Sequence, residues 1–147
     1  MNQKGIALVE VLAAMVILVM VVSLSFTILI QSRTQSKLNQ DRLIAHQVGL
    51  MLSQYTFRYL SEESQYDALF AFIGDAPSKV LNQTSCSLNF SSSFCDFLFS
   101  VTINQTVYND SRLVITVYEP VLGVIRLELT VFYASTRSVT HEVLLYE

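Results

Sequence analysis

The chain begins with a long apolar segment that contains one charged side chain. From Ile6 to Ile30 the sequence runs for 25 residues, and Glu10 is the only ionisable side chain among them. As a helix rising about 1.5 Å per residue, the segment spans about 37 Å, enough to cross a bilayer with some tilt. A charge in such a segment costs about 2.5–3.5 kcal/mol near the bilayer centre and less near its ends. Glu10 is therefore expected to have a function and a partner.

The residues before the apolar segment indicate what that partner is. Gly5 precedes Ile6, and Lys4 precedes Gly5. Cleavage between Gly5 and Ile6 would create an amine one helical turn from Glu10 and would remove Lys4. We expect this amine, in the same chain or in a neighbour, to pair with the carboxylate.

This arrangement resembles the amino terminus of type IV prepilins and of type II secretion pseudopilins. The matching elements are a leader of residues 1–5, an apolar residue at Ile6, Glu10 as fifth residue of the processed chain, and the run from Leu8 to Leu12. The match is close over the first 30 residues and holds in outline beyond them. The resemblance implies cleavage after Gly5 by a prepilin peptidase, methylation of the Ile6 amine, and extrusion by a cytoplasmic ATPase with a membrane platform protein.

Two departures from major pilins narrow the expectation. Major subunits commonly carry a proline within the membrane helix, whereas this chain has Thr27 nearest that position, and Ala7 stands where a threonine or other polar residue is frequent. The sequence from Leu8 to Ala14 is similar instead to minor pilins of the modification type and to I-type pseudopilins. We therefore expect a minor pilin that joins or primes a type IV pilus with other major and minor pilins. A major pilin, a secretion pseudopilin and a competence pseudopilin are the alternatives within the family.

Other classes of protein explain the apolar segment differently. It would also serve as the signal anchor of a sensor or binding domain that never polymerises. A cleaved secretory signal would need Ser23–Ser25 as its cleavage site, but the apolar run continues through Ile30 and Glu10 lies inside the supposed core. The expected location is a single pass through the cytoplasmic membrane with the head outside, followed by an extracellular filament. Charge supports this orientation only weakly, because Arg33 and Lys37 flank the other end of the segment.

The whole chain is predicted to be an α+β, pilin-like fold. One helix from about Ile6 to Leu60 packs its second half on a four-stranded antiparallel sheet. The expected parts are the leader (1–5), a transmembrane half-helix (6–30), an amphipathic half-helix (31–60) and a head (61–147). One face of the amphipathic half is apolar, since the following positions share it: Leu38, Ala45, Val48, Leu52, Tyr55 and Tyr59. Gly49 either costs the helix about 1 kcal/mol or marks a close contact.

Within the head we expect a connecting αβ loop at 61–93 and the sheet at 94–147. A short helix from Ser64 to Ile73 ends at Gly74, and residues 82–93 are predicted to be loop. Alternating apolar residues predict strands at 95–103, 113–117, 125–133 and 139–146, with hairpin connections at 109–111 and 119–123.

Two cysteines, Cys86 and Cys95, lie in the head with eight residues between them. In an exported domain this spacing is typical of one local disulfide, although two free thiols are the alternative. One cysteine pair and two distant histidines do not form a ligand cluster, so no metal site is expected.

The remaining chemistry argues against catalysis and nucleic-acid binding. From Ser61 onward there are ten acidic and four basic residues, a net charge of −6, which disfavours binding by phosphate neutralisation. His46 and His141 are expected to be isolated surface or packing residues, and Glu62-Glu63 a solvated pair. Phe94, Phe97 and Phe99 are expected in the sheet core. We therefore predict neither an enzyme nor a cofactor.

Overall fold

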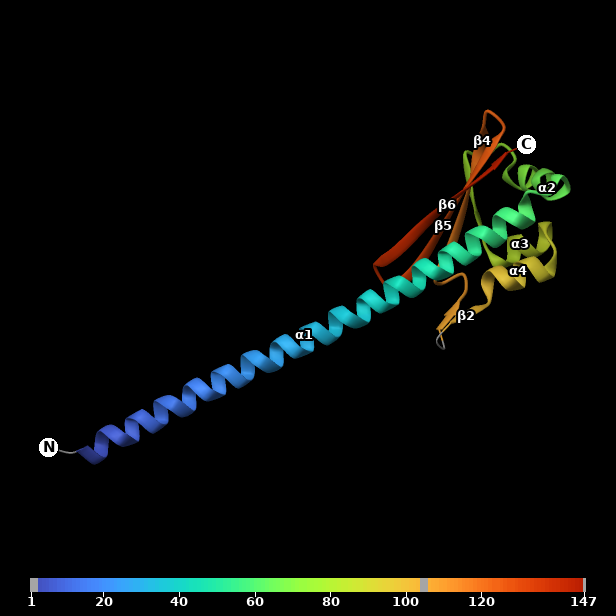
Figure 1. The fold of residues 1–147 in the computed structure, drawn as a ribbon. Helices are drawn as coiled ribbons and strands as arrows, with labels where there is room; N and C mark the ends of the chain where they lie inside the picture. The colour runs from blue at the N-terminus through green and yellow to red at the C-terminus, as the bar shows by residue number, and fades with distance from the viewer. Residues whose placement is uncertain (1–2, 104–105, 147) are drawn as a thin grey trace. The chain divides into compact units, whose positions relative to one another are not determined.

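The computed structural model describes the backbone of residues 3–103 and 106–146, and the side chains of residues 9–103 and 106–146. The chain divides into two compact units, Met1–Gln40 and Asp41–Glu147. One helix, α1 (Gln3–Leu60), contributes to both units, and Figure 1 follows the elements along the chain. From here on, the head means the whole second unit, which includes residues 41–60 of α1 as well as the region 61–147 that the sequence predicted as the head.

The first unit is the amino-terminal part of α1. The expected helix from Ile6 to Leu60 is confirmed, with its start three residues earlier at Gln3 and its end at Leu60. The sequence from Ile6 to Val48 contains neither glycine nor proline, so nothing interrupts the backbone hydrogen bonds of the helix.

The second unit begins with the part of α1 from Asp41 to Leu60. Its apolar face is fully buried at Ala45, Val48, Leu52 and Leu60, which recur every three or four residues. Tyr55 and Tyr59 are half-buried on the same face. The predicted amphipathic stripe is therefore confirmed over this part of the helix.

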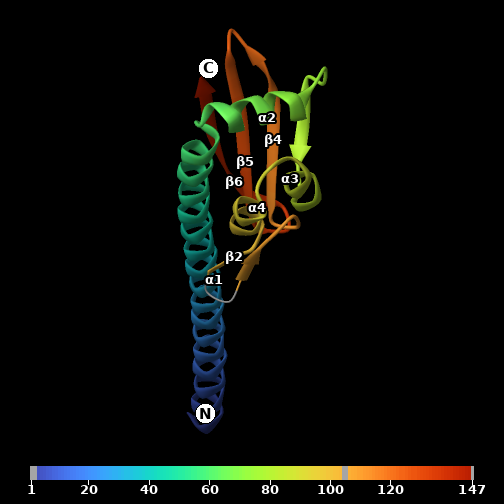
Figure 2. The same cartoon turned by 90° about the vertical axis from the view of Figure 1, so that its right-hand side faces the viewer.

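The sheet against which this stripe packs has four antiparallel strands in the order β1-β4-β5-β6. These are β1 (Ser78–Leu81), β4 (Leu113–Val121), β5 (Val124–Ala134) and β6 (Arg137–Tyr146). Alternate residues of β4 and β5 are buried, which gives the sheet one buried face. Figure 2 shows α2 (Glu63–Ile73), α3 (Gln83–Asn89) and α4 (Ser92–Phe99) on one side of this sheet. The expected α+β fold, a long helix packed on a four-stranded antiparallel sheet, is confirmed.

The composition of that sheet differs from the prediction. The strand expected at 95–103 is wrong over most of its length, because residues 92–99 form α4, and the predicted loop at 82–93 contains α3. Side chains cap the amino-terminal ends of both helices. At the start of α3, Asn82 Oδ1 accepts from the Ser85 N–H at 2.8 Å, and at the start of α4, Ser91 Oγ accepts from the Phe94 N–H at 3.3 Å. Such caps favour helix starts over the extended chain that the alternating aromatics suggested.

The fourth strand of the sheet is β1, which the sequence prediction left inside the connecting region. It has four residues, of which only Leu81 is buried, so its alternation is too short to detect. After α4 the chain forms a separate two-stranded sheet from β2 (Val101–Ile103) and β3 (Thr106–Tyr108). Residues 109–111 are thus a turn between two sheets, and the predicted hairpin there is wrong.

Two other predicted connections are confirmed with small changes. The short helix α2 begins at Glu63 instead of Ser64 and ends before Gly74, whose φ of 59° is the left-handed conformation that favours glycine. The connection predicted at 119–123 is a tight hairpin turn at Leu122-Gly123, between β4 and β5.

Candidate functional site

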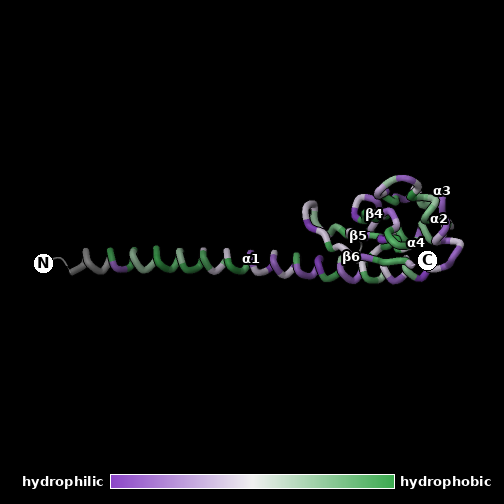
Figure 3. The backbone as a smooth tube through the Cα atoms, turned by 90° about the horizontal axis from the view of Figure 1, so that it is seen from above, coloured by the Kyte–Doolittle hydropathy of each residue, from purple (hydrophilic) through white to green (hydrophobic). Residues whose placement is uncertain are grey.

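The apolar part of α1 from Val9 to Ile30 is exposed throughout. Its large side chains are between 45% and 65% exposed, and the most apolar 18-residue window has a mean hydropathy of 2.8. Figure 3 shows this stretch in mostly hydrophobic colour, followed along the helix by mixed polar and apolar residues. Among the residues that the structure describes, α1 is the one helix that is both long enough and apolar enough to cross a membrane. Its surface is favourable only against lipid or other apolar helices.

Hydroxyl side chains within and just after this stretch are satisfied by the helix itself. Ser23, Ser25, Thr27 and Thr34 each donate to the carbonyl four residues earlier, at 2.8–3.0 Å. A hydroxyl without a partner in hydrocarbon costs free energy, and these bonds avoid that cost. The hydroxyl side chains of the segment are therefore compatible with an apolar environment.

Glu10 is an exposed side chain of α1, one of the first side chains that the structure describes. The backbone of Lys4, Gly5 and Ile6 belongs to the same helix, and their side chains lie outside the described residues. The predicted cleavage between Gly5 and Ile6, the methylation of Ile6 and the leader charge of Lys4 therefore remain predictions. Along a helix Ile6 and Glu10 are four residues apart, so a carboxylate and an amine at these positions lie within one turn.

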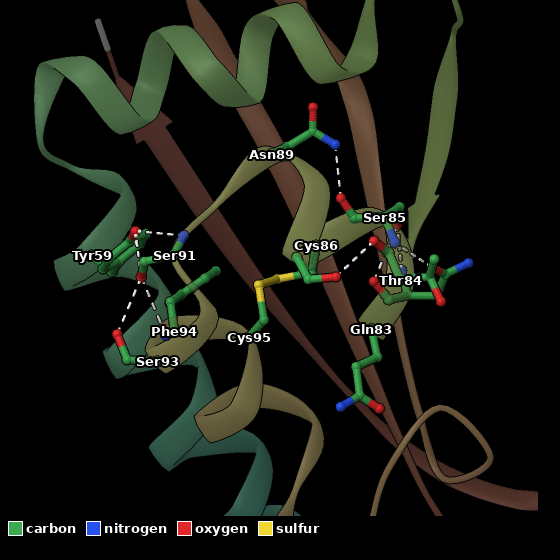
Figure 4. The surroundings of a disulfide bond; sticks show 12 residues. Tyr59, Gln83, Thr84, Ser85, Cys86, Asn89, Ser91, Ser93, Phe94 and Cys95 are labelled. Atoms are coloured by element: carbon green, nitrogen blue, oxygen red, sulfur yellow. Dashed lines mark hydrogen bonds between the residues drawn. A yellow bond between two sulfur atoms is a disulfide. The ribbon is translucent and has the colours of Figure 1, made fainter.

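The expected disulfide is present between Cys86 of α3 and Cys95 of α4. The sulfur atoms are 2.06 Å apart and the Cα atoms 5.7 Å apart, and both residues are buried. Figure 4 shows the bond between the two helices, beside Tyr59 and Phe94. The Tyr59 and Phe94 rings stack with centroids 4.0 Å apart, and Tyr59 Oη donates to Ser91 Oγ at 3.0 Å. The disulfide and this stack hold α3 and α4 against α1.

The aromatic residues expected in the sheet core lie on α4 instead. Phe94 and Phe99 are buried, as predicted, but by helix packing. Phe97 is 38% exposed and its ring centroid lies 4.0 Å from that of Tyr55. The prediction of core residues is right for two positions, although their secondary structure was wrong.

The structure brings together two histidines that the sequence analysis treated as isolated. The rings of His46 on α1 and His141 on β6 have centroids 4.8 Å apart. Gly49 makes this possible, since a Cβ there would lie 2.1 Å from His141 Cδ2. Burial and the neighbouring His46 lower the pKa of His141 below its ordinary value of 6.5. The close contact that Gly49 was predicted to mark is this one.

Neither histidine belongs to a recognisable metal centre. Among the residues described here, no three His, Cys, Asp or Glu side chains are placed to hold one ion. The Glu62 and Glu63 side chains are exposed at the start of α2, as expected for a solvated pair.

On the sheet, Tyr118 Oη donates to Glu128 at 2.8 Å, and this hydrogen bond raises the pKa of Tyr118. The Arg126 guanidinium carbon lies 4.1 Å from the centre of the Tyr118 ring.

Comparison with known proteins adds no relative. No protein-family model, no curated protein and no solved structure matches this chain.

Proposed function

We propose that the chain is a minor pilin, a membrane-stored subunit that is cleaved after Gly5 and joins or primes a type IV filament. The observation that carries the proposal is an exposed apolar helix from Val9 to Ile30 that holds a single carboxylate, Glu10. The same helix, α1 (Gln3–Leu60), also supplies residues of the head, so membrane insertion and assembly would use one continuous element of secondary structure. A type II secretion or competence pseudopilin would use the same elements.

The driving force for assembly is apolar packing between helices once the subunits leave the membrane. Small residues such as Ala13 and Ala14 permit close approach of neighbouring backbones. Apolar packing alone does not fix how far one helix slides along the next. A buried carboxylate that must meet an amine does fix it, which is the best attested use of buried charges.

Cleavage would supply that amine and remove an obstacle. The new terminus at Ile6 would pair with Glu10 of an adjacent subunit, and Lys4 would leave with the leader. By resemblance, the partners are a prepilin peptidase, an assembly ATPase with its platform protein, and other pilins. The subunit itself is not proposed to hold a cofactor.

Processing in the cell tests the proposal most directly. The mature protein should begin at Ile6 with a methylated amine, as determined by mass spectrometry of the amino-terminal peptide from membranes and from sheared fibres. A membrane protein that retains Met1 and never co-purifies with fibres would instead be an anchored sensor or binding domain.

The role of Glu10 is tested by a matched pair of variants. Glu10→Ala should insert into membranes normally but be lost from sheared fibres, because the register-fixing charge is gone. Glu10→Gln, which keeps the size and a hydrogen-bonding group, separates the charge from the shape. Equal incorporation of Glu10→Ala and the unmodified chain would remove the register argument.

A further inference from the structure

The hairpin between β4 and β5 has an exposed leucine, Leu122, in a backbone conformation that is unfavourable for leucine. Leu122 has φ 56° and Gly123 has φ 76°, the pair of positive values found in tight two-residue hairpin turns. Glycine and asparagine suit such positions, whereas a leucine there is strained by its Cβ. The side chain is 98% exposed, so packing within the head does not compensate for that strain.

Leu122 belongs to a larger apolar surface, which we call the tip patch. It consists of Phe70, Val121 and Leu122, which are 55%, 70% and 98% exposed, together with the exposed acids Asp67 and Glu119. Figure 2 shows the hairpin projecting beyond the sheet near α2. Backbone strain at an exposed apolar residue is typical of a position kept for binding.

Contacts with α2 hold the hairpin turn of the tip patch in place. Tyr66 Oη donates to the Gly123 carbonyl at 3.0 Å, which ties the turn to α2. A cavity of about 360 Å³ between α2 and the hairpin is lined by Tyr66, Asp67, Phe70, Pro120 and Gly123. A fixed turn beside an open cavity loses little conformational freedom when a partner binds it.

A second exposed surface lies on α1, which we call the outer stripe, and at Phe57 it borders a cavity that is also lined by Val143 and Leu144 of β6. Its apolar members are Leu43, Leu50 and Phe57, spaced by seven residues and 57%, 43% and 49% exposed. Arg42 and Arg58 are exposed, each next in sequence to an end member of the stripe and about 100° around the helix from it. The outer stripe is thus apolar and flanked by basic side chains, while the tip patch is apolar and acidic.

Charge strengthens the match between the two surfaces. Asp41 is the one acid between residues 41 and 60, and it is half-buried at a helical spacing that places it on the same face as Ala45 and Val48. Glu142 of β6 borders the stripe at Phe57, and its carboxylate lies 3.7 Å from Arg126 Nε, which offsets its charge. The rest of the head, from Ser61, carries a net charge of −6 from ten acidic and four basic residues. Like charges would oppose contact between two tip patches and opposite charges favour contact of a tip patch with an outer stripe.

We propose that the tip patch of one copy docks on the outer stripe of a second copy, with Leu122 packed beside Leu50. The two surfaces differ, so the contact is heterologous and repeats from copy to copy instead of ending at a dimer. This inference deepens the proposed filament function and rests on it for its biological setting. It concerns the heads, whereas the Glu10 pairing concerns the apolar helices.

Cross-linking of purified full-length protein in nonionic detergent tests the contact. Cys86 and Cys95 are bonded to each other, so an introduced cysteine reacts alone. A Leu122→Cys copy mixed with a differently tagged Leu50→Cys copy should give a mixed dimer. The yield should be at least fivefold above that of the control pair Val80→Cys and Leu50→Cys, since Val80 is 51% exposed on β1 outside both surfaces.

Three outcomes would overturn the proposal. The first is a yield of mixed dimer equal to that of the Val80 control pair. The second is a dominant product between two Leu122→Cys copies, which would mean contact between two tip patches. The third is a yield of mixed dimer that does not fall when the salt concentration is raised. Charge reversal adds a matched test, in which Asp67→Lys with Glu119→Lys abolishes the product. Combining that copy with an Arg42→Glu, Arg58→Glu copy should restore it.

Leu122→Gly separates binding from folding. Glycine relieves the positive φ, so the thermal midpoint of the head should stay equal or rise. Self-association should nevertheless fall roughly tenfold, the change expected from losing one buried leucine side chain. If the variant associates as well as the parent, the tip patch is not the docking surface.

The cross-linking result does not depend on cleavage or on fibres. A negative result in detergent removes the head contact and leaves the filament proposal intact. An intact Met1 in cells removes the filament proposal and leaves the head contact standing as a separate property of the protein.

Discussion

The two parts of α1 are rich in the same apolar residues but differ in how those residues are distributed. Between Val9 and Ile30 the apolar side chains surround the helix and all are exposed. Between Asp41 and Leu60 they are interrupted by polar residues, and one face is buried against the head. A helix that is apolar all round needs an environment that its own domain does not provide, whereas a striped helix finds its partner within the fold.

The tyrosines allow the two parts to be followed separately. All seven lie between Tyr55 and Tyr146, within the head, and the chain has no tryptophan. Near-ultraviolet circular dichroism of the full-length protein in detergent therefore reports mainly on the head.

The largest contrast is expected from one truncation in each part. Leu52→Ala removes a fully buried side chain and should destabilise the head by about 2–5 kcal/mol. Leu18→Ala changes a side chain that is 65% exposed in the other unit and should leave the tyrosine melting curve unchanged. Thermal melts of the two variants measure the difference. Equal shifts would mean that the two parts of α1 unfold together.

The disulfide should be the next largest contribution, and it too should act on the head alone. Replacing both Cys86 and Cys95 by serine opens a loop with a sequence separation of 9 residues. The loss of chain constraint is expected to lower head stability by about 2.5 kcal/mol. Chemical denaturation monitored by tyrosine ellipticity gives the value. Unchanged stability in the double serine variant would assign the constraint to the Tyr59–Phe94 stack instead.

A smaller effect with a diagnostic sign is expected at Gly49. Alanine there would place a Cβ 2.1 Å from the His141 ring, and such overpacking costs about 1–3 kcal/mol. The better helix propensity of alanine offsets up to about 1 kcal/mol of this loss. In a His141→Ala background the clash is gone, so Gly49→Ala should become stabilising. A double-mutant cycle of melting curves tests this reversal, and no change of sign would show that the ring is not the obstacle.

Elements with long hydrophobic patterns could be predicted from the sequence, whereas short elements could not. The apolar segment, the buried stripe and three long strands have patterns that extend over many residues, and each was predicted near its true bounds. β1 has four residues with one buried, so it carries no pattern of its own. It is fixed by pairing with β4, as in Lys79 opposite Val117.

The errors around 82–99 arose where local capping competed with alternation. Cys95, Phe97 and Phe99 alternate, yet Phe94, Cys95, Leu98 and Phe99 are the buried set, with helical spacing. Asn82 precedes α3 and Ser91 precedes α4, and residues of these types favour a helix start at the position that follows them. The histidine pair had no such signal, since His46 and His141 are 95 positions apart in the sequence and only the tertiary packing brings them together.

The smallest expected effect is the pH dependence of the head near neutrality. His141 Nε2 is buried without a partner among the described residues, and burial with the nearby His46 lowers the pKa of His141 below 6.5. In the unfolded chain the pKa of His141 returns to that ordinary value, so the unfolded state binds more protons as the pH falls. The contribution of His141 is thus fully present above pH 6.5 and is lost as the pH falls towards the lower pKa of the folded state.

Tyrosine melting curves between pH 7.5 and roughly 5 measure this loss, and a His141→Gln variant is the matched control. Glutamine does not titrate, so the thermal midpoint of this variant should change less with pH over that range. Acidic residues of the head still lower the stability of both proteins at more acidic pH, because carboxylates titrate near pH 4. Parallel pH profiles for the two proteins would show that His141 is solvated in solution, in which case Gly49 accommodates the ring for shape alone. A flatter profile in the variant would make the packed half of α1 sensitive to protons through its contact with β6, a property that the apolar half lacks because it contains no histidine.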